Sequence, residues 1–137
     1  MQAQPLYMLD TDTCIFLLRK SSPRLLERIQ SIPLNQQVIS VVTHAELLYG
    51  VHISSKKKAN QAAVDLLTRH LAILDWPRAA APHYAEIRAD LKKKGAQLGA
   101  NDLLIAAHAL SLGAVVVTNN TKDFRRVRGL HIENWMQ

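Results

Sequence analysis

The sequence predicts an α/β fold in which helices pack on both faces of a central parallel sheet, forming a three-layer sandwich. Two observations carry this prediction. Short runs of apolar residues are almost unbroken, which is typical of parallel strands buried on both faces. Between these runs lie longer segments with helical periodicity. A chain of 137 residues, 48% of them hydrophobic, is long enough for a substantial core, and we expect residues 1–137 to form a single domain.

The order of elements follows from these patterns. We expect strands at residues 6–10, 38–42, 71–75 and 114–118, with a fifth at 130–133. A helix, "TCIFLLRK", follows the first strand. In the segment 77–94, Tyr84, Ile87 and Leu91 recur at a spacing of three and four, which predicts an amphipathic helix. The stretch "DLLIAAHALSL", residues 102–112, is apolar on nearly all sides and predicts a helix deep in the domain.

The charge of the chain suggests a polyanionic partner. Seventeen Lys and Arg against eleven Asp and Glu give a net charge of +6. The basic residues gather in clusters at Lys56–Lys58, Lys92–Lys94 and Arg125–Arg128. A helix C-terminus also favours Lys, and Lys92–Lys94 stand just before a predicted cap at Gly95. Both interpretations stay open at this point.

The sequence also favours a cytoplasmic location. The one cysteine, Cys14, cannot form an internal disulfide and lies in an apolar stretch where a reduced thiol is expected. No basic segment precedes an apolar core at the N-terminus, and Asp10 and Asp12 interrupt the only candidate stretch. We therefore expect neither a signal peptide nor a membrane span.

Four acids follow strands or open the buried helix. Asp10 comes directly after the first strand, Glu46 shortly after the second, and Asp123 after the fourth, whereas Asp102 begins the helix that follows Gly99. Ligands of open parallel sheets bind beyond the carboxyl ends of the strands. The sequence thus predicts that these carboxylates converge at one edge of the sheet.

Each acid also has a purely structural interpretation. Thr43 and Glu46 in "THAE" match a capping box, and Asp102 suits the first turn of a helix that Asn101 would cap. We assign the capping of the first helix to Asp12 and keep Asp10 for chemistry. His108 shares a stripe with Leu104 and Leu112, so we expect it to be a partly buried packing residue.

Converging carboxylates need a counter-charge. Two like charges about 4 Å apart repel by roughly 4 kcal/mol at an effective dielectric constant near 20. The repulsion energy of several such pairs would be large compared with a total free energy of unfolding of about 5 to 15 kcal/mol. Oxygen ligands without a Cys or His cluster suit Mg²⁺, or Mn²⁺, better than zinc.

The motifs "YMLDTDTCIFLLR", "SVVTHAELLYG" and "LGANDLLIAAHALSLGAVVVTNNTKDFRRVRGLHIENW" resemble those of PIN-domain ribonucleases, and among them the VapC-type toxins of toxin–antitoxin pairs. The resemblance spans Tyr7 to Trp135 and implies a Rossmann-like sandwich. It makes Asp10, Glu46 and Asp102 the acids of the first three motifs. At the fourth position, where many PIN domains carry an acid, this chain has Asn120, and Asp123 stands three residues later. Asp12 occupies a position where the toxins often have Asn.

The resemblance further implies a Mg²⁺-dependent endoribonuclease that inhibits translation by cutting tRNA, with initiator tRNA and its anticodon stem-loop as candidates. Asp10 and Asp102 would hold the metal, with Glu46 and Asp123 acting through water or on a second ion. The candidates for positioning these groups are Thr11, Asp12, Thr43, Thr118, Asn119 and Asn120. Arg125 and Arg126, close to Asp123, are the candidates for RNA binding.

Implied partners are the RNA substrate, a VapB-type antitoxin and a second copy of the chain. Two other functions share the acidic cluster. One is a catalytically inactive module that binds RNA or protein, and the other is a metal-dependent phosphohydrolase of small phosphate esters. The basic excess argues mildly against the second.

Overall fold

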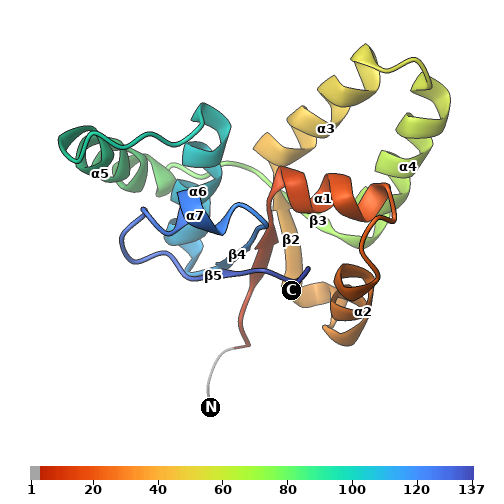
Figure 1. The fold of residues 1–137 in the computed structure, drawn as a ribbon, viewed down its shortest axis with the longest axis horizontal. Coiled ribbons are helices and arrows are strands. Elements are labelled where there is room, and N and C mark those ends of the chain that lie inside the picture. Colours follow the sequence, from red (N-terminus) through yellow and green to blue (C-terminus); the bar gives the residue numbers. More distant parts are fainter. Residues whose placement is uncertain (1–3) are drawn as a thin grey trace.

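The computed structural model describes residues 4–137 and contains a five-stranded, entirely parallel sheet with helices on both faces (Figure 1). The strand order is β3-β2-β1-β4-β5, so the first strand lies in the middle of the sheet. The strands are β1 (Tyr7–Leu9), β2 (Gln37–Ser40), β3 (Ala72–Leu74), β4 (Val115–Val117) and β5 (Ile132–Glu133). The α/β fold predicted from the apolar runs is confirmed.

The second strand ends earlier than predicted. We expected it to span residues 38–42, but β2 stops at Ser40, and Val41 already belongs to helix α3. The Ser40 hydroxyl accepts a hydrogen bond from the backbone N–H of Val42 at 3.1 Å and so caps the helix. The apolar pattern of Val41 and Val42 suits either element, and the serine cap decides between them.

Seven α-helices and one short 3₁₀ helix connect the strands within the described residues. They are α1 (Thr11–Leu18), α2 (Pro23–Ser31), η1 (Leu34–Gln36), α3 (Val41–Ile53), α4 (Lys57–His70), α5 (Ala80–Lys93), α6 (Ala100–Leu112) and α7 (Thr121–Phe124). The predicted amphipathic and buried helices correspond to α5 and α6. Gly95, at a φ of +65°, follows α5 as expected of a C-terminal cap. The expected cap at Asn101 is wrong, because Gly99 occupies that position and Asn101 lies inside α6.

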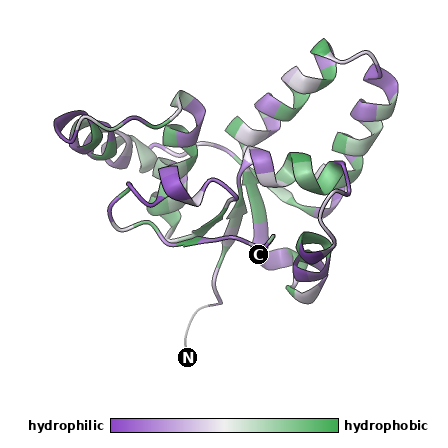
Figure 2. Cartoon of the chain, viewed as in Figure 1, coloured by the Kyte–Doolittle hydropathy of each residue, from purple (hydrophilic) through white to green (hydrophobic). Residues whose placement is uncertain are grey.

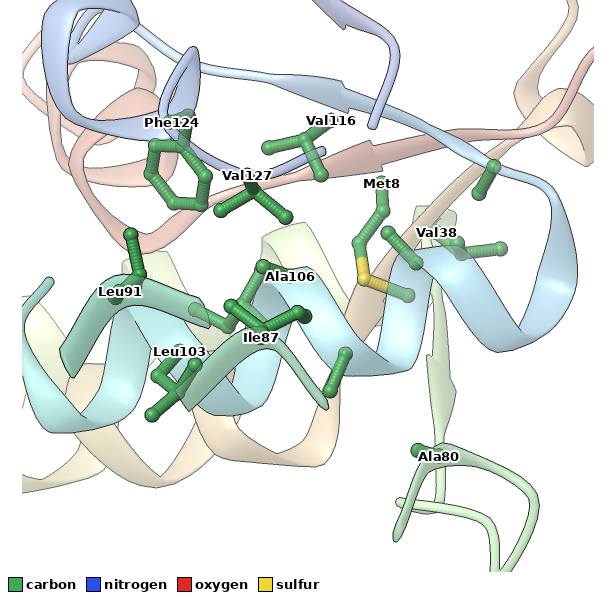
Figure 3. Packing of buried hydrophobic residues seen from close by; sticks show 14 residues of the cluster. Met8, Val38, Ala80, Ile87, Leu91, Leu103, Ala106, Val116, Phe124 and Val127 are labelled. Carbon is green, nitrogen blue, oxygen red and sulfur yellow. The ribbon is translucent and has the colours of Figure 1, made fainter. Parts of the chain in front are cut away.

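The sheet separates two hydrophobic cores. Met8, Val38 and Val116 face α5, α6 and α7, where they pack with residues such as Ile87 and Phe124 (Figure 3). The next residue of each strand points the opposite way, as the pleat requires, so Leu9, Ile39 and Val117 face α1 to α4. In Figure 2 the centre of the sheet is mostly hydrophobic, in agreement with burial on both faces.

Helices α3 and α4 form a hairpin that extends away from the sheet (Figure 1). Its outer surface exposes large apolar side chains at Tyr49, Ile53 and Leu66. Among residues 4–137, no helix is both long enough and apolar enough to cross a membrane. The exposed side chains on the hairpin form apolar surface that the rest of this chain does not cover.

Candidate active site

The candidate site lies at the carboxyl edge of the sheet. In the central pair of strands, Leu9 of β1 is in register with Val117 of β4, and the N–H of Asp10 donates to the Val117 carbonyl at 3.0 Å. Because β2 runs parallel to β1, helix α3 also begins at this edge. The residues that follow three neighbouring strands are thereby brought together.

Asp10 is buried at the start of α1 and caps that helix. Its Oδ1 accepts a hydrogen bond from the N–H of Thr13 at 2.9 Å. Our assignment of the cap to Asp12 was wrong, because α1 already begins at Thr11 and leaves Asp12 exposed in its first turn. Burial raises the pKa of Asp10, while hydrogen bonds from Thr118 and Thr13 act in the opposite direction. The backbone cap engages Oδ1, and the Thr118 hydroxyl is a further hydrogen-bond partner of the carboxylate.

Glu46 does not form a capping box. Ser40, and not Thr43, caps α3, so Glu46 lies in the second turn of the helix. Its Oε1 accepts a hydrogen bond from the Thr11 hydroxyl at 2.6 Å, and the Thr11 and Thr43 hydroxyl oxygens are 3.2 Å apart. A hydroxyl has one proton, so the shorter contact is its donation to the carboxylate. Thr11 thus orients Glu46 across the boundary between α1 and α3.

The fourth strand leads into a chain of polar contacts. The Thr118 hydroxyl bonds to Asp10 and accepts from the N–H of Asn120 at 2.9 Å. The Asn120 amide donates to Asp123 Oδ2 at 3.0 Å, so the two candidates for the fourth acidic position lie side by side. Asn119 is exposed and accepts from the Asn134 amide at 3.2 Å.

Asp102 reveals that the acids share one electrostatic environment. It is half-buried in the first turn of α6. Burial raises its pKa to about 6, and the negative charges of four other acids add to the rise. These acids are Asp10, Asp12, Glu46 and Asp123. Helices α1, α3 and α7 therefore bring four carboxylates into electrostatic range of Asp102.

The donor chemistry of this cluster fits a hard divalent cation. The five candidates offer carboxylate oxygens, which Mg²⁺ and Mn²⁺ prefer, and a cation would offset the charge that raises the pKa of Asp102. In the described part of the chain no three acidic, histidine or cysteine side chains enclose a common point as closely as metal ligands do. Binding a cation would thus require the carboxylates to turn toward it.

The two candidate RNA-binding arginines differ in their surroundings. Both are exposed, but Arg126 donates to the Gln97 carbonyl at 3.0 Å and lies 3.5 Å from Asp123 Oδ1. The contact with Gln97 links the turn after α7 to the segment after α5, and Lys92–Lys94 stand at the end of α5. The hydrogen bond from Lys94 lowers the pKa of Asp90, and the charges of Arg128 and Lys93 lower it further. These two basic clusters are therefore neighbours.

The third basic cluster lies elsewhere. Lys56–Lys58 stand at the start of α4, at the outer end of the α3–α4 hairpin (Figure 1). Lys92 and Lys93 lie in the last turn of α5, as the helix C-terminal interpretation expects, and Lys94 also bonds to Asp90 at 2.9 Å.

Several residues of the site were not found from the sequence. Thr13 is buried, donates to the Val117 carbonyl at 3.0 Å and presents its N–H to Asp10. Its spacing of three from Asp10 is the signal of an Asp N-cap and could have identified it. Asn134 and the buried pair Ser40 and His108, 2.9 Å apart, carry no comparable local signal. We expected His108 to be partly buried, but it is fully buried.

Comparison with known proteins agrees with this architecture. The PIN domain family model matches residues 7–130. The chain is 40% identical to Ribonuclease VapC2 of Rickettsia felis over 95% of this chain and 98% of that protein. It is 41% identical to the tRNA(fMet)-specific endonuclease VapC of Salmonella typhimurium over 94% and 97% of the two chains. The structure superimposes with a TM-score of 0.91 on a chain in the crystal structure of DNA-bound VapBC from Salmonella typhimurium, at 40% identity and covering 96% and 99%.

The fold, the matched range and the position of the acids define one class: the chain belongs to the PIN-domain family. Within that family its full-length similarity is to VapC-type ribonucleases, as the sequence motifs indicated.

Proposed function

We propose that this chain is the toxin of a toxin–antitoxin pair and acts as a Mg²⁺-dependent endoribonuclease. One observation carries the proposal: five carboxylates gather at the carboxyl edge of the sheet in a chain that is 41% identical to a tRNA(fMet)-specific endonuclease. By that similarity the proposed substrate is initiator tRNA, and we propose that the cut lies in its anticodon stem-loop. Loss of this tRNA would stop translation.

In this mechanism Asp10 and Asp102 would hold the metal, and Glu46 and Asp123 would act through water or on a second ion. The metal supplies charge neutralisation at the phosphate and a lower pKa for water. Thr11 holds Glu46 by Oε1 and leaves Oε2 available to accept a proton from the attacking water. Asn120 holds Asp123 by Oδ2, and Arg126 lies 3.5 Å from its Oδ1. Because water attacks the phosphorus, the products carry a 5′-phosphate and a 3′-hydroxyl.

Arg125 is the residue we assign to phosphate binding. It is exposed beside the acidic cluster, and the neighbouring Lys92–Lys94 and Arg128 extend the positive surface. Arg126 contributes mainly by holding Asp123 and the segment at Gln97.

The antitoxin would cover the apolar groove between α1, α3 and α4. This groove encloses about 220 Å³, and its lining includes Leu18, Leu47 and Val51 together with Glu46. An apolar helix would fit it, and an Arg at the end of that helix could pair with the carboxylates. The VapBC complexes among the similar structures support a VapB-type partner. The remaining apolar surface of the hairpin, at Tyr49, Ile53 and Leu66, would serve a second copy of the chain or the same antitoxin.

The decisive experiment is cleavage of purified initiator and elongator tRNAs by the isolated chain, followed by sequencing of the RNA ends. We expect cleavage of the initiator tRNA that stops with EDTA and returns with Mg²⁺, and ends of the stated chemistry. Binding without cleavage at any Mg²⁺ concentration would favour an inactive binding module. Hydrolysis of small phosphate esters without RNA cleavage would favour a phosphohydrolase.

A further inference from the structure

A buried hydrogen bond connects the two helices that carry Glu46 and Asp102. His108, in α6, is fully buried, and its Nδ1 lies 2.9 Å from the hydroxyl oxygen of Ser40. Ser40 is the last residue of β2 and also caps α3 through the N–H of Val42. A single hydroxyl therefore joins a strand, the start of α3 and the middle of α6.

Both acids lie within two helical turns of this bond. Glu46 follows Ser40 by six residues along α3, and Asp102 precedes His108 by six residues along α6. The outer end of α3 extends away from the sheet with α4 (Figure 1), so the start of the helix is where it meets the body of the protein. The position of Glu46 relative to Asp102 thus depends on contacts near Ser40.

Packing alone does not account for an imidazole at this place. The neighbouring residues of α6 are buried and apolar, among them Ile105, Ala107 and Ala109. His108 Nε2 has no hydrogen-bond partner among residues 4–137. A buried polar atom without a partner lowers stability, whereas a leucine would fill similar space without that cost.

We propose that His108 is a positioning residue: its hydrogen bond to Ser40 fixes α3 against α6 and thereby sets Glu46 against Asp102 for catalysis. This inference rests on the proposed function, because it assigns His108 a role in metal-dependent cleavage. His108 acts through Ser40 and touches neither metal nor RNA.

Two substitutions of similar polarity separate positioning from packing. His108→Asn places an amide near the position of Nδ1 and can still reach Ser40, whereas His108→Gln places its amide near the position of Nε2 and cannot. His108→Leu removes the bond and keeps the volume. Ser111→Ala is the control, because within residues 4–137 the Ser111 hydroxyl bonds only to the His108 carbonyl of its own helix, at 2.7 Å.

The measurements are thermal unfolding without metal, Mn²⁺ affinity by calorimetry, and kcat and KM for RNA cleavage. For His108→Gln and His108→Leu we expect kcat and Mn²⁺ affinity to fall by about tenfold, the lower end of what supporting residues of metal sites show, with KM unchanged. His108→Leu should keep or raise the unfolding temperature. His108→Asn should restore most of both losses, and Ser111→Ala should match the wild type.

A wild-type protein that binds Mn²⁺ and cleaves RNA, with His108→Gln equal to His108→Asn in both measurements, would overturn this inference alone. So would losses that simply follow the unfolding temperature across all variants. A wild-type protein that neither binds Mn²⁺ nor cleaves RNA would overturn the proposed function, and the inference with it.

Discussion

Replacement of Asp102 by Asn should stabilise the metal-free protein at neutral pH. Asn has nearly the same shape as Asp and removes one charge from the cluster of five. The rise of the Asp102 pKa from 3.8 to about 6 corresponds to about 3 kcal/mol at 1.36 kcal/mol per pH unit. Because Asp102 is only half-buried, solvent screening reduces this to about 1 to 2 kcal/mol.

One effect opposes the gain. Asp102 lies in the first turn of α6, where a negative charge is favoured by about 0.3 to 1 kcal/mol. The net expectation for Asp102→Asn is therefore a gain of about 1 kcal/mol, or about 4 °C in the unfolding temperature of a domain of this size. The sign of the measured change in unfolding free energy will show whether repulsion and burial outweigh the helix dipole at Asp102.

The pH dependence provides the sharper test. An acid whose folded-state pKa is raised binds its proton more tightly in the folded protein, so its destabilisation is absent below about pH 4 and complete above about pH 6. We expect the stability difference between Asp102→Asn and wild type in urea unfolding with EDTA to be near zero at about pH 4 and positive at about pH 7.5. Asp65→Asn, an exposed residue of α4, is the matched control and should show no such trend.

Added Mg²⁺ should reverse the ranking, because a ligand that binds only the folded state stabilises it and the variant has lost a proposed ligand. An Asp102→Asn protein that is less stable than wild type at neutral pH without metal would refute the assignment of Asp102 to a repulsive cluster. Equal differences at both pH values would refute it as well.

Three further outcomes are expected. Asp10→Asn should fold, because Asn also caps helices well, but it should lose RNA cleavage; cleavage by the folded variant in a tRNA assay would exclude Asp10 as a metal ligand. Glu46→Gln keeps an acceptor for the Thr11 hydroxyl, so urea unfolding should change by less than about 0.5 kcal/mol while cleavage falls at least tenfold or so. Arg125→Gln should lower the slope of log binding constant against log salt by about 0.7, whereas Gln substitutions at Lys56–Lys58 should not.

The sequence was sufficient to predict the sheet, because strands buried on both faces produce apolar runs that a local pattern reveals. It failed where one residue decides between two compatible elements. Val41 and Val42 suit a strand, and only the Ser40 hydroxyl, bonded to the Val42 N–H, shows that a helix starts there. For a similar reason we predicted Asp12 as the cap of the first helix, whereas Asp10 caps it. The two acids are two residues apart, and both stand beside an apolar helical segment.

The convergence of the acids could be predicted, but the contacts that orient them could not. That four acids follow element ends is visible in the chain, and the carboxyl edge of a parallel sheet is a general location for ligands. The partners of these acids depend on tertiary structure: Thr11 reaches Glu46 across 35 positions, and His108 reaches Ser40 across 68. No periodicity connects such pairs.

The same polar groups that start the helices also hold the acids, which explains how the fold tolerates a concentrated negative charge. The Asp10 carboxylate caps α1, and the Ser40 hydroxyl caps α3. The cap of α1 fixes the helix that carries Thr11, the hydrogen-bond partner of Glu46. The cap of α3 fixes the helix that carries Glu46 itself. Moving the backbone of α1 or α3 to relieve repulsion within the cluster would open a cap, and a lost cap costs about 1 kcal/mol. The carboxylates are therefore kept near one another before any cation binds, and a cation has only to turn side chains, not to assemble the edge of the sheet.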